Sequence, residues 1–203
     1  MIKNLLFDMG NVLMRFSPEV FVARLGLSDR DARLLKNTVF GGVDWVSLDR
    51  GAITEEELLE RACARLPEEL RAAAEALVRR WDEPPLSVEG MEALVGELWE
   101  AGWPLYLLTN AGPRHRTYWP KYPAARYFPE ERVFRSADYK LLKPEPEFYL
   151  TALARFGLRA EECLFIDDNA VNAEAAVRLG MDAVVFHGAD DLRRALAERG
   201  LPV

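Results

Sequence analysis

Residues 3–8 read Lys-Asn-Leu-Leu-Phe-Asp, a short apolar run that ends in a carboxylate. A continuous apolar run of this length is typical of a strand that is buried on both faces of a sheet. The pattern returns at residues 104–109 (Pro-Leu-Tyr-Leu-Leu-Thr) and 163–168 (Cys-Leu-Phe-Ile-Asp-Asp), and residues 183–186 (Ala-Val-Val-Phe) form a further apolar run. These four stretches predict a parallel sheet with helices on both of its faces.

Helical segments separate the predicted strands, and each ends at a glycine, a usual residue just past the last helical turn. In one segment Tyr149, Ala152, Leu153 and Phe156 recur at helical spacing. The alternation of strands and helices predicts a doubly wound α/β fold. The predicted helices cover residues 88–101, 145–156 and 170–179, before Gly102, Gly157 and Gly180.

Residues 16–87 interrupt this alternation, because their pattern is helical throughout. Thr54 and Glu57 have the spacing of a capping box at a helix start, and Pro84-Pro85 ends the segment. A helical insertion after the first strand is typical of a cap domain. We therefore expect a helical cap at residues 16–87 and a core domain formed by residues 1–15 and 88–203.

The composition narrows the classes of partner. The chain has 203 residues, 50% of them hydrophobic, and a formal net charge of −7. An acidic surface repels nucleic acids and anionic membranes, so we expect neither as a partner. The two cysteines, Cys63 and Cys163, form no CxxC pattern, which argues against a disulfide scaffold or a zinc site and fits a cytoplasmic protein. No apolar run is long enough for a signal peptide or a membrane span, and the oligomeric state is unknown.

Polar residues stand at the ends of three predicted strands. Ligands bind outside the carboxyl ends of parallel strands, so residues from these ends are expected to meet in one crevice. Lys143 joins them from the loop before a helix. The residues expected to converge are Asp8, Thr109, Asn110, Lys143, Asp167 and Asp168.

Carboxylates this close together cannot all stay ionised without a compensating cation. A hard divalent ion with oxygen ligands compensates them, and Mg²⁺ fits this description best. A phosphate group would then be held by the ion, by Lys143, by the Thr109 hydroxyl and by the Asn110 backbone N–H. The sequence therefore predicts a site for Mg²⁺ and a small phosphorylated metabolite.

Four segments resemble, in their order and spacing, the four motifs of the haloacid dehalogenase (HAD) superfamily of hydrolases. The resemblance covers essentially the whole chain. It implies a Rossmann-like three-layer α/β core with a parallel sheet and a small helical cap inserted after the first strand. The DxGNV form of the first motif and the stretch 114–120 (Arg-His-Arg-Thr-Tyr-Trp-Pro) resemble, more narrowly, the α-glucose-1-phosphate phosphatase branch. The four segments are Asp8-Met-Gly-Asn-Val-Leu, Leu-Leu-Thr109-Asn110, Lys143-Pro-Glu-Pro and Phe165-Ile-Asp167-Asp168-Asn169.

The resemblance implies a Mg²⁺-dependent phosphatase, with a sugar 1-phosphate as the narrower expectation. Asp8 would be the nucleophile and would form an aspartyl-phosphate intermediate. The remaining roles follow the motif positions. The Mg²⁺ ligands would be Asp8, the Gly10 carbonyl and Asp167. The phosphate-binding residues would be Thr109, Asn110 and Lys143, and Lys143 would also be catalytic. Asp168 and Asn172 would support the site close to the metal.

One position departs from the family pattern. Most phosphatases of the family carry a second aspartate two residues after the nucleophile, as general acid and base, and here that position is Gly10. Two alternatives therefore stay open: a 2-haloacid dehalogenase, which needs no metal, and a non-catalytic binding protein that kept the fold. Gly10 with Asn11-Val12 fits a phosphatase better than a dehalogenase, and intact Asp8 and Lys143 argue against a loss of turnover.

Five further residues have more than one interpretation. Asp168 fits either the metal site or the start of the helix at residue 170, and so does Asn172. Trp45 and Asp44 fit the cap side of the pocket, and Trp45 fits packing inside the cap at least as well. His115 is expected in a loop rather than at the reaction centre.

Overall fold

The computed structural model describes residues 1–201 of the chain. Its centre is a sheet of five parallel strands in the order β3-β2-β1-β4-β5. In the central strand β1, Phe7 lies opposite Leu107 of β2 on one side and opposite Ile166 of β4 on the other. The strands are β1 (Asn4–Phe7), β2 (Leu105–Thr109), β3 (Val133–Arg135), β4 (Cys163–Asp167) and β5 (Asp182–Val185).

Strands β1, β2, β4 and β5 confirm the four predicted strands, with bounds that differ by no more than one residue at either end. The sequence did not predict β3. Its three residues are too few for a periodicity to show, and the last of them is charged. Arg135 is nevertheless only 2% exposed, because Glu130 and Asp138 pair with its guanidinium.

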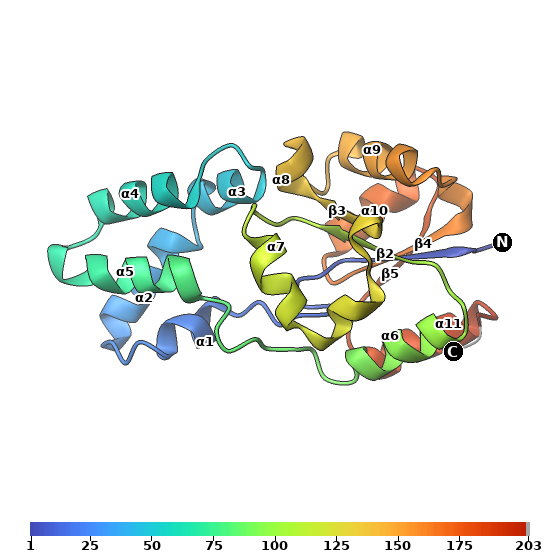
Figure 1. Ribbon diagram of the computed structural model, residues 1–203, viewed down its shortest axis with the longest axis horizontal. Helices are drawn as coiled ribbons and strands as arrows, with labels where there is room; N and C mark the ends of the chain where they lie inside the picture. Colours follow the sequence, from blue (N-terminus) through green and yellow to red (C-terminus); the bar gives the residue numbers. More distant parts are fainter. Residues whose placement is uncertain (202–203) are drawn as a thin grey trace.

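Helices cover both faces of the sheet, so the core has three layers (Figure 1). Leu5 and Phe7 of β1 belong to the apolar cluster that contains residues of α6 and α11, whereas Leu6 belongs to the cluster under α9 and α10. Successive side chains of β1 therefore enter opposite layers, as expected for a strand covered on both faces. The covering helices are α6 (Met91–Glu100), α9 (Pro146–Phe156), α10 (Ala170–Arg178) and α11 (Ala189–Glu198), of which α11 has no counterpart among the predicted helices.

Six helices follow one another between β1 and β2, and the first five of them form one end of the elongated molecule (Figure 1). The predicted capping box is present, because Thr54 and Glu57 each accept the other's backbone N–H at the start of α4. Met14 bridges to Ser87, so the two ends of the helical segment meet beside the core. The division into cap and core at residues 16–87 stays a prediction. These five helices are α1 (Pro18–Ala23), α2 (Asp29–Val39), α3 (Val43–Asp49), α4 (Glu55–Arg65) and α5 (Glu68–Arg80).

Short helical turns link β2, β3 and β4. The expectation of a loop at His115 is wrong, because this residue lies in α7 and is fully buried. Its Nδ1 accepts the Nε–H of Arg135 at 2.7 Å, and burial lowers the pKa of His115 well below its usual value. The turns are α7 (His115–Tyr118), α8 (Ser136–Tyr139), η1 (Trp119–Lys121), η2 (Pro123–Tyr127), η3 (Glu130–Arg132) and η4 (Ala160–Glu162).

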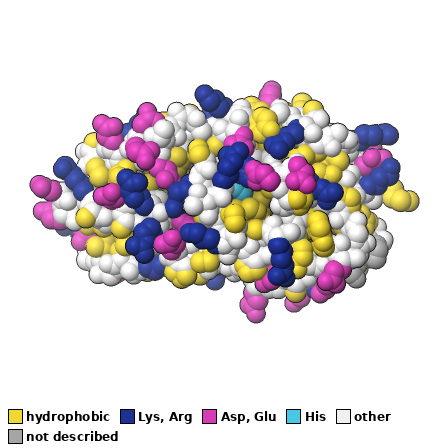
Figure 2. All heavy atoms as spheres, in the orientation of Figure 1, with side chains coloured by type: hydrophobic (Ala, Val, Ile, Leu, Met, Phe, Trp, Pro, Cys, Tyr) yellow, Lys and Arg dark blue, Asp and Glu magenta, His cyan; other side chains and the backbone are white. Residues whose placement is uncertain are grey.

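The surface carries charges of both signs. On the face seen in Figure 2, lysine and arginine side chains are interspersed with aspartate and glutamate over both ends of the molecule. Among residues 1–201, no helix is both long and apolar enough to cross a membrane.

Candidate active site

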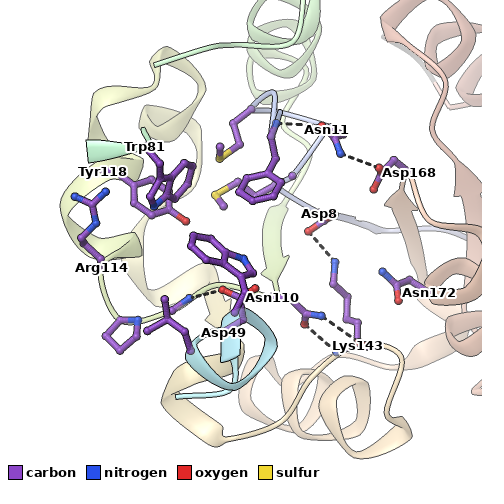
Figure 3. Close-up of a pocket in the computed structure, with 18 of the residues that line it drawn as sticks. Asp8, Asn11, Asp49, Trp81, Asn110, Arg114, Tyr118, Lys143, Asp168 and Asn172 are labelled. Carbon is purple, nitrogen blue, oxygen red and sulfur yellow. Dashed lines mark hydrogen bonds and ion pairs between the residues drawn. The ribbon is translucent and has the colours of Figure 1, made fainter. Parts of the chain in front are cut away.

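The carboxyl ends of β1, β2 and β4 carry the polar residues that the sequence predicts to meet. Asp8 follows β1 directly, and its N–H donates to the Ile166 carbonyl of β4 at 2.8 Å. Asn110 follows β2, and Asp167 is the last residue of β4. Because neighbouring parallel strands end at the same edge, these residues gather around Lys143, which arrives from the loop before α9. Figure 3 shows Asp8 and Asn110 beside Lys143.

Lys143 is the centre of a buried group of ions. Its Nζ lies 2.7 Å from Oδ1 of Asp8 and 2.6 Å from Oδ2 of Asp167. Burial alone would lower the pKa of Lys143, but the two carboxylates together raise it, so the ammonium keeps its charge. Burial raises the pKa of Asp8 to about 7; Lys143 opposes this shift, and the negative charge of Asp167 adds to it.

A third carboxylate completes a cluster that could hold a cation. One oxygen each of Asp8, Asp167 and Asp168 lies within 4.8 Å of the other two. When ionised, three carboxylates around a single ammonium leave an excess of negative charge, which a divalent ion with oxygen ligands would balance. The donor set therefore fits Mg²⁺. Gly10, whose carbonyl is the remaining predicted ligand, lines the same pocket as Asp8.

Asn110 fixes the loop that carries Lys143. Its Nδ2 donates to the Lys143 carbonyl at 3.0 Å, and its Oδ1 accepts the Lys143 N–H at 2.9 Å. This side-chain role adds to the predicted one, which used only the Asn110 backbone N–H. Thr109 is 1% exposed and is not among the described residues that line the pocket, so its contact with phosphate stays a prediction.

Asn172 orients one of the carboxylates. Its Nδ2 donates to both oxygens of Asp167, at 3.0 and 3.2 Å. The N-cap of α10 is Asn169, whose side chain accepts the Val171 N–H. The alternative interpretation of Asp168 as the helix cap is therefore wrong, and its side chain faces the carboxylate cluster instead.

A pocket opens onto these polar groups. It has a volume of about 820 Å³, including the space at its open mouth. Four aromatic side chains form part of its wall, and their rings contact one another: Trp81 lies 5.9 Å from Trp45 and 5.0 Å from Tyr118 between ring centroids. An apolar chamber with a few converging polar groups is the usual form of a small-molecule site. Trp81 and Tyr118 are labelled in Figure 3. The apolar wall consists of Met9, Met14, Phe16, Trp45, Leu48, Trp81, Pro113 and Tyr118.

The neighbouring residues Asp44 and Trp45 have different roles in the structure. Asp44 is buried and pairs with Arg61 at 3.0 Å and Arg65 at 2.6 Å, away from the residues that line the pocket. Trp45 does line the pocket, and it also packs on Phe40 with 4.5 Å between ring centroids. The prediction that Asp44 lines the pocket is therefore wrong, whereas Trp45 both lines the pocket and packs on its neighbour.

Sequence reasoning missed three charged residues of the pocket, Asp49, Glu55 and Arg114. Oδ1 of Asp49 accepts the Gly112 N–H at 3.1 Å. Arg114 forms ion pairs with Glu55, at 2.9 Å, and with Asp82. No motif marks Asp49, and the signal for Arg114 was the resemblance of residues 114–120 to one branch of the family.

The fold and the site define the class of protein. The model of the haloacid dehalogenase-like hydrolase family matches residues 2–180. The chain belongs to this family.

Relatives and a solved structure agree with this assignment. The chain is 27% identical to flavin mononucleotide hydrolase 1 of Arabidopsis thaliana over 78% of its own length and 63% of that protein's, and it thus spans less than two thirds of that relative. It is 28% identical to a sesquiterpene phosphatase of Aspergillus oryzae, over 98% of its own length and 96% of the relative's. A HAD family enzyme of Bacteroides thetaiotaomicron, solved with magnesium and inorganic phosphate, superposes with a TM-score of 0.72 over 96% of this chain and 99% of the other, at 22% identity.

Proposed function

We propose that this chain is a Mg²⁺-dependent phosphatase that acts on a small phosphorylated metabolite through an aspartyl-phosphate on Asp8. The observation that carries the proposal is the cluster of Asp8, Asp167 and Asp168 around Lys143 at the polar end of the pocket. A nucleophile, cation ligands and a phosphate-binding ammonium thus lie side by side. The names of the two relatives support the proposal, as does the magnesium and phosphate complex of the Bacteroides enzyme.

The residues of the site divide the reaction between them. An oxygen of Asp8 attacks phosphorus, and the bond to the leaving oxygen breaks. Lys143 holds the phosphoryl oxygens and offsets the charge that develops on them, while Asn110 keeps the Lys143 loop in place. Mg²⁺, held by Asp8, the Gly10 carbonyl and Asp167, would add positive charge at the phosphoryl group. Water then attacks phosphorus and releases Asp8.

Hydrolysis of p-nitrophenyl phosphate with and without Mg²⁺ tests this proposal. A phosphatase releases p-nitrophenolate only when the ion is present. A dehalogenase would instead release halide from a 2-haloacid in the presence of a chelator. A non-catalytic protein would bind the ester without turnover.

The lining of the pocket favours a particular kind of organic group. A sugar 1-phosphate, the narrower expectation, carries hydroxyls that need hydrogen-bond partners when buried. The wall formed by Phe16, Trp45, Trp81 and Tyr118 offers mainly ring faces. We therefore favour an aryl or other apolar phosphate ester as the substrate. A sugar 1-phosphate remains the alternative that the resemblance suggests.

We expect the wild type to hydrolyse 1-naphthyl phosphate with a higher kcat/KM than glucose 1-phosphate. Trp45→Leu should lower kcat/KM for 1-naphthyl phosphate by roughly fivefold to tenfold, because a ring–ring contact is worth about 1 kcal/mol. Acetyl phosphate is the control substrate: it has no ring to pack on Trp45, so its kcat/KM should change less than about twofold. A preference of the wild type for glucose 1-phosphate would contradict the apolar candidate and favour the sugar.

A further inference from the structure

The helical segment brings a carboxyl group into the pocket from α3. Asp49 is the last residue of α3 and lines the same pocket as Asp8 and Gly10 (Figure 3). Gly10 occupies the position at which most phosphatases of this family carry their acid. The pocket thus lacks a carboxyl group at one expected position and contains one at another.

Contacts with the core hold Asp49 in place. Its Oδ1 accepts the Gly112 N–H at 3.1 Å, and its backbone carbonyl accepts the hydroxyl of Ser136. The chain packs tightly just beyond it, because a Cβ on Gly51 would lie 2.6 Å from the Ala137 carbonyl oxygen. The end of α3 is therefore attached to the loop after β2 and to α8, which positions the Asp49 carboxyl relative to Asp8.

The surroundings of Asp49 favour its protonated form. Within residues 1–201, no basic side chain forms an ion pair with this carboxyl. Burial raises the pKa of Asp49 to about 8, and the negative charge of Asp8 adds to this shift. Hydrogen bonds from the Gly112 N–H and from Trp45 oppose the shift. A carboxyl group that keeps its proton at neutral pH can donate it.

We propose that Asp49 is the general acid and base of the reaction, in place of the aspartate that Gly10 replaces. This inference rests on the proposed phosphatase function. Asp49 lines the same pocket as Asp8, into which the organic part of the substrate must project, so its carboxyl is available to the leaving oxygen.

Asp49 gives up its proton in the first step of the reaction and regains one in the second. In the first step Asp8 bonds to phosphorus, the phosphorus–oxygen bond to the organic group breaks, and the leaving oxygen takes the proton of Asp49. The products are a neutral alcohol and the Asp49 carboxylate. In the second step water attacks phosphorus, its proton returns to Asp49, and the bond between Asp8 and phosphorus breaks.

The experiment compares two leaving groups in the Asp49→Asn variant. 2-Phenylethyl phosphate must release an alkoxide, which needs a proton, whereas p-nitrophenyl phosphate releases a stable anion. We expect kcat/KM for 2-phenylethyl phosphate to fall about 10²- to 10³-fold, the usual contribution of a general acid, and kcat/KM for p-nitrophenyl phosphate to fall less than about threefold. The ratio kcat/KM reports only the steps up to the first irreversible one, so the second step does not obscure the comparison.

Asp49→Asn keeps the volume of the side chain and the acceptor for the Gly112 N–H. Three further variants separate the loss of proton transfer from a structural effect. Asp49→Glu keeps the acid and should retain more activity on the alkyl ester than Asp49→Asn. Glu55→Gln removes another carboxylate of the pocket and should change both substrates by the same factor. Gly10→Asp in the Asp49→Asn background should restore alkyl ester hydrolysis, because a Cβ on Gly10 would meet no atom closer than 3.9 Å.

The possible results lead to different conclusions. A loss confined to the alkyl ester, with recovery in Gly10→Asp, supports the proposal. Equal losses on both esters, or no loss on either, overturn the role of Asp49 and leave the phosphatase function in place. Absence of Mg²⁺-dependent p-nitrophenyl phosphate hydrolysis by the wild type overturns the proposed function, and the inference with it.

Discussion

The variant Asp8→Asn is expected to lower kcat/KM for p-nitrophenyl phosphate by ~10³-fold or more, the scale of losing a covalent nucleophile. Asparagine nearly keeps the volume of the side chain but removes the attacking oxygen charge and one expected metal ligand. The fold should remain intact, because the substitution also reduces the crowding of negative charge around Lys143. Thermal unfolding followed by circular dichroism, together with steady-state kinetics, measures both effects.

Asp182→Asn is the matched control, because Asp182 lies at the start of β5 and pairs with Arg199 on the surface. Its kcat/KM should stay close to that of the wild type. Activity of Asp8→Asn above about a tenth of the wild-type value would refute the nucleophile assignment. A stable beryllofluoride adduct on Asp8 would support it.

The second large effect is expected on removal of divalent ions. EDTA should abolish phosphatase activity, and added Mg²⁺ should restore it, because the cluster of Asp8, Asp167 and Asp168 carries more negative charge than Lys143 can balance. The measurement is the initial rate as a function of free Mg²⁺. Full activity in the chelator would favour the dehalogenase alternative.

Substitutions in the cluster should differ in a defined order. Asp167→Ala is expected to raise the half-saturating Mg²⁺ concentration by about 100-fold or more, because it removes an expected metal ligand. The substitution also removes one ion-pair partner of Lys143. Asn172→Ala should raise it by about 10- to 100-fold, because Asn172 only orients Asp167. Asp168→Ala should have a smaller effect than Asp167→Ala. A larger effect of Asp168→Ala would show that the roles of the two carboxylates are exchanged.

The sequence by itself was sufficient for four strands of the sheet and for the polar end of the pocket. Four of the five strands could be located because each is a continuous apolar run, and strands of this kind need both faces covered. Since the polar residues follow these runs directly, the geometry of a parallel sheet brings Asp8, Asn110 and Asp167 to one edge. The strand β3 escaped detection because a run of three residues that ends in Arg135 carries no usable pattern.

Local signals also identified the helical segment between β1 and β2. The capping box at Thr54 and Glu57 depends only on residues three apart, so it could be predicted without tertiary structure. The N-cap of α10 is equally local, yet the sequence left open which of several polar residues forms it. In the structure Asn169 caps the helix, because Asp168 faces the carboxylate cluster.

Only the tertiary structure decided what surrounds the reacting groups. The pairing of Asn110 with Lys143 joins residues 33 positions apart, and the bond between Asp49 and Gly112 joins residues 63 apart. Amphipathic helices show which of their faces is buried, but their sequence does not show which part of the core that face will meet. The aromatic wall and Asp49 therefore became visible only once the helices lay against the strand ends, because contacts between distant segments depend on the packing of the whole chain.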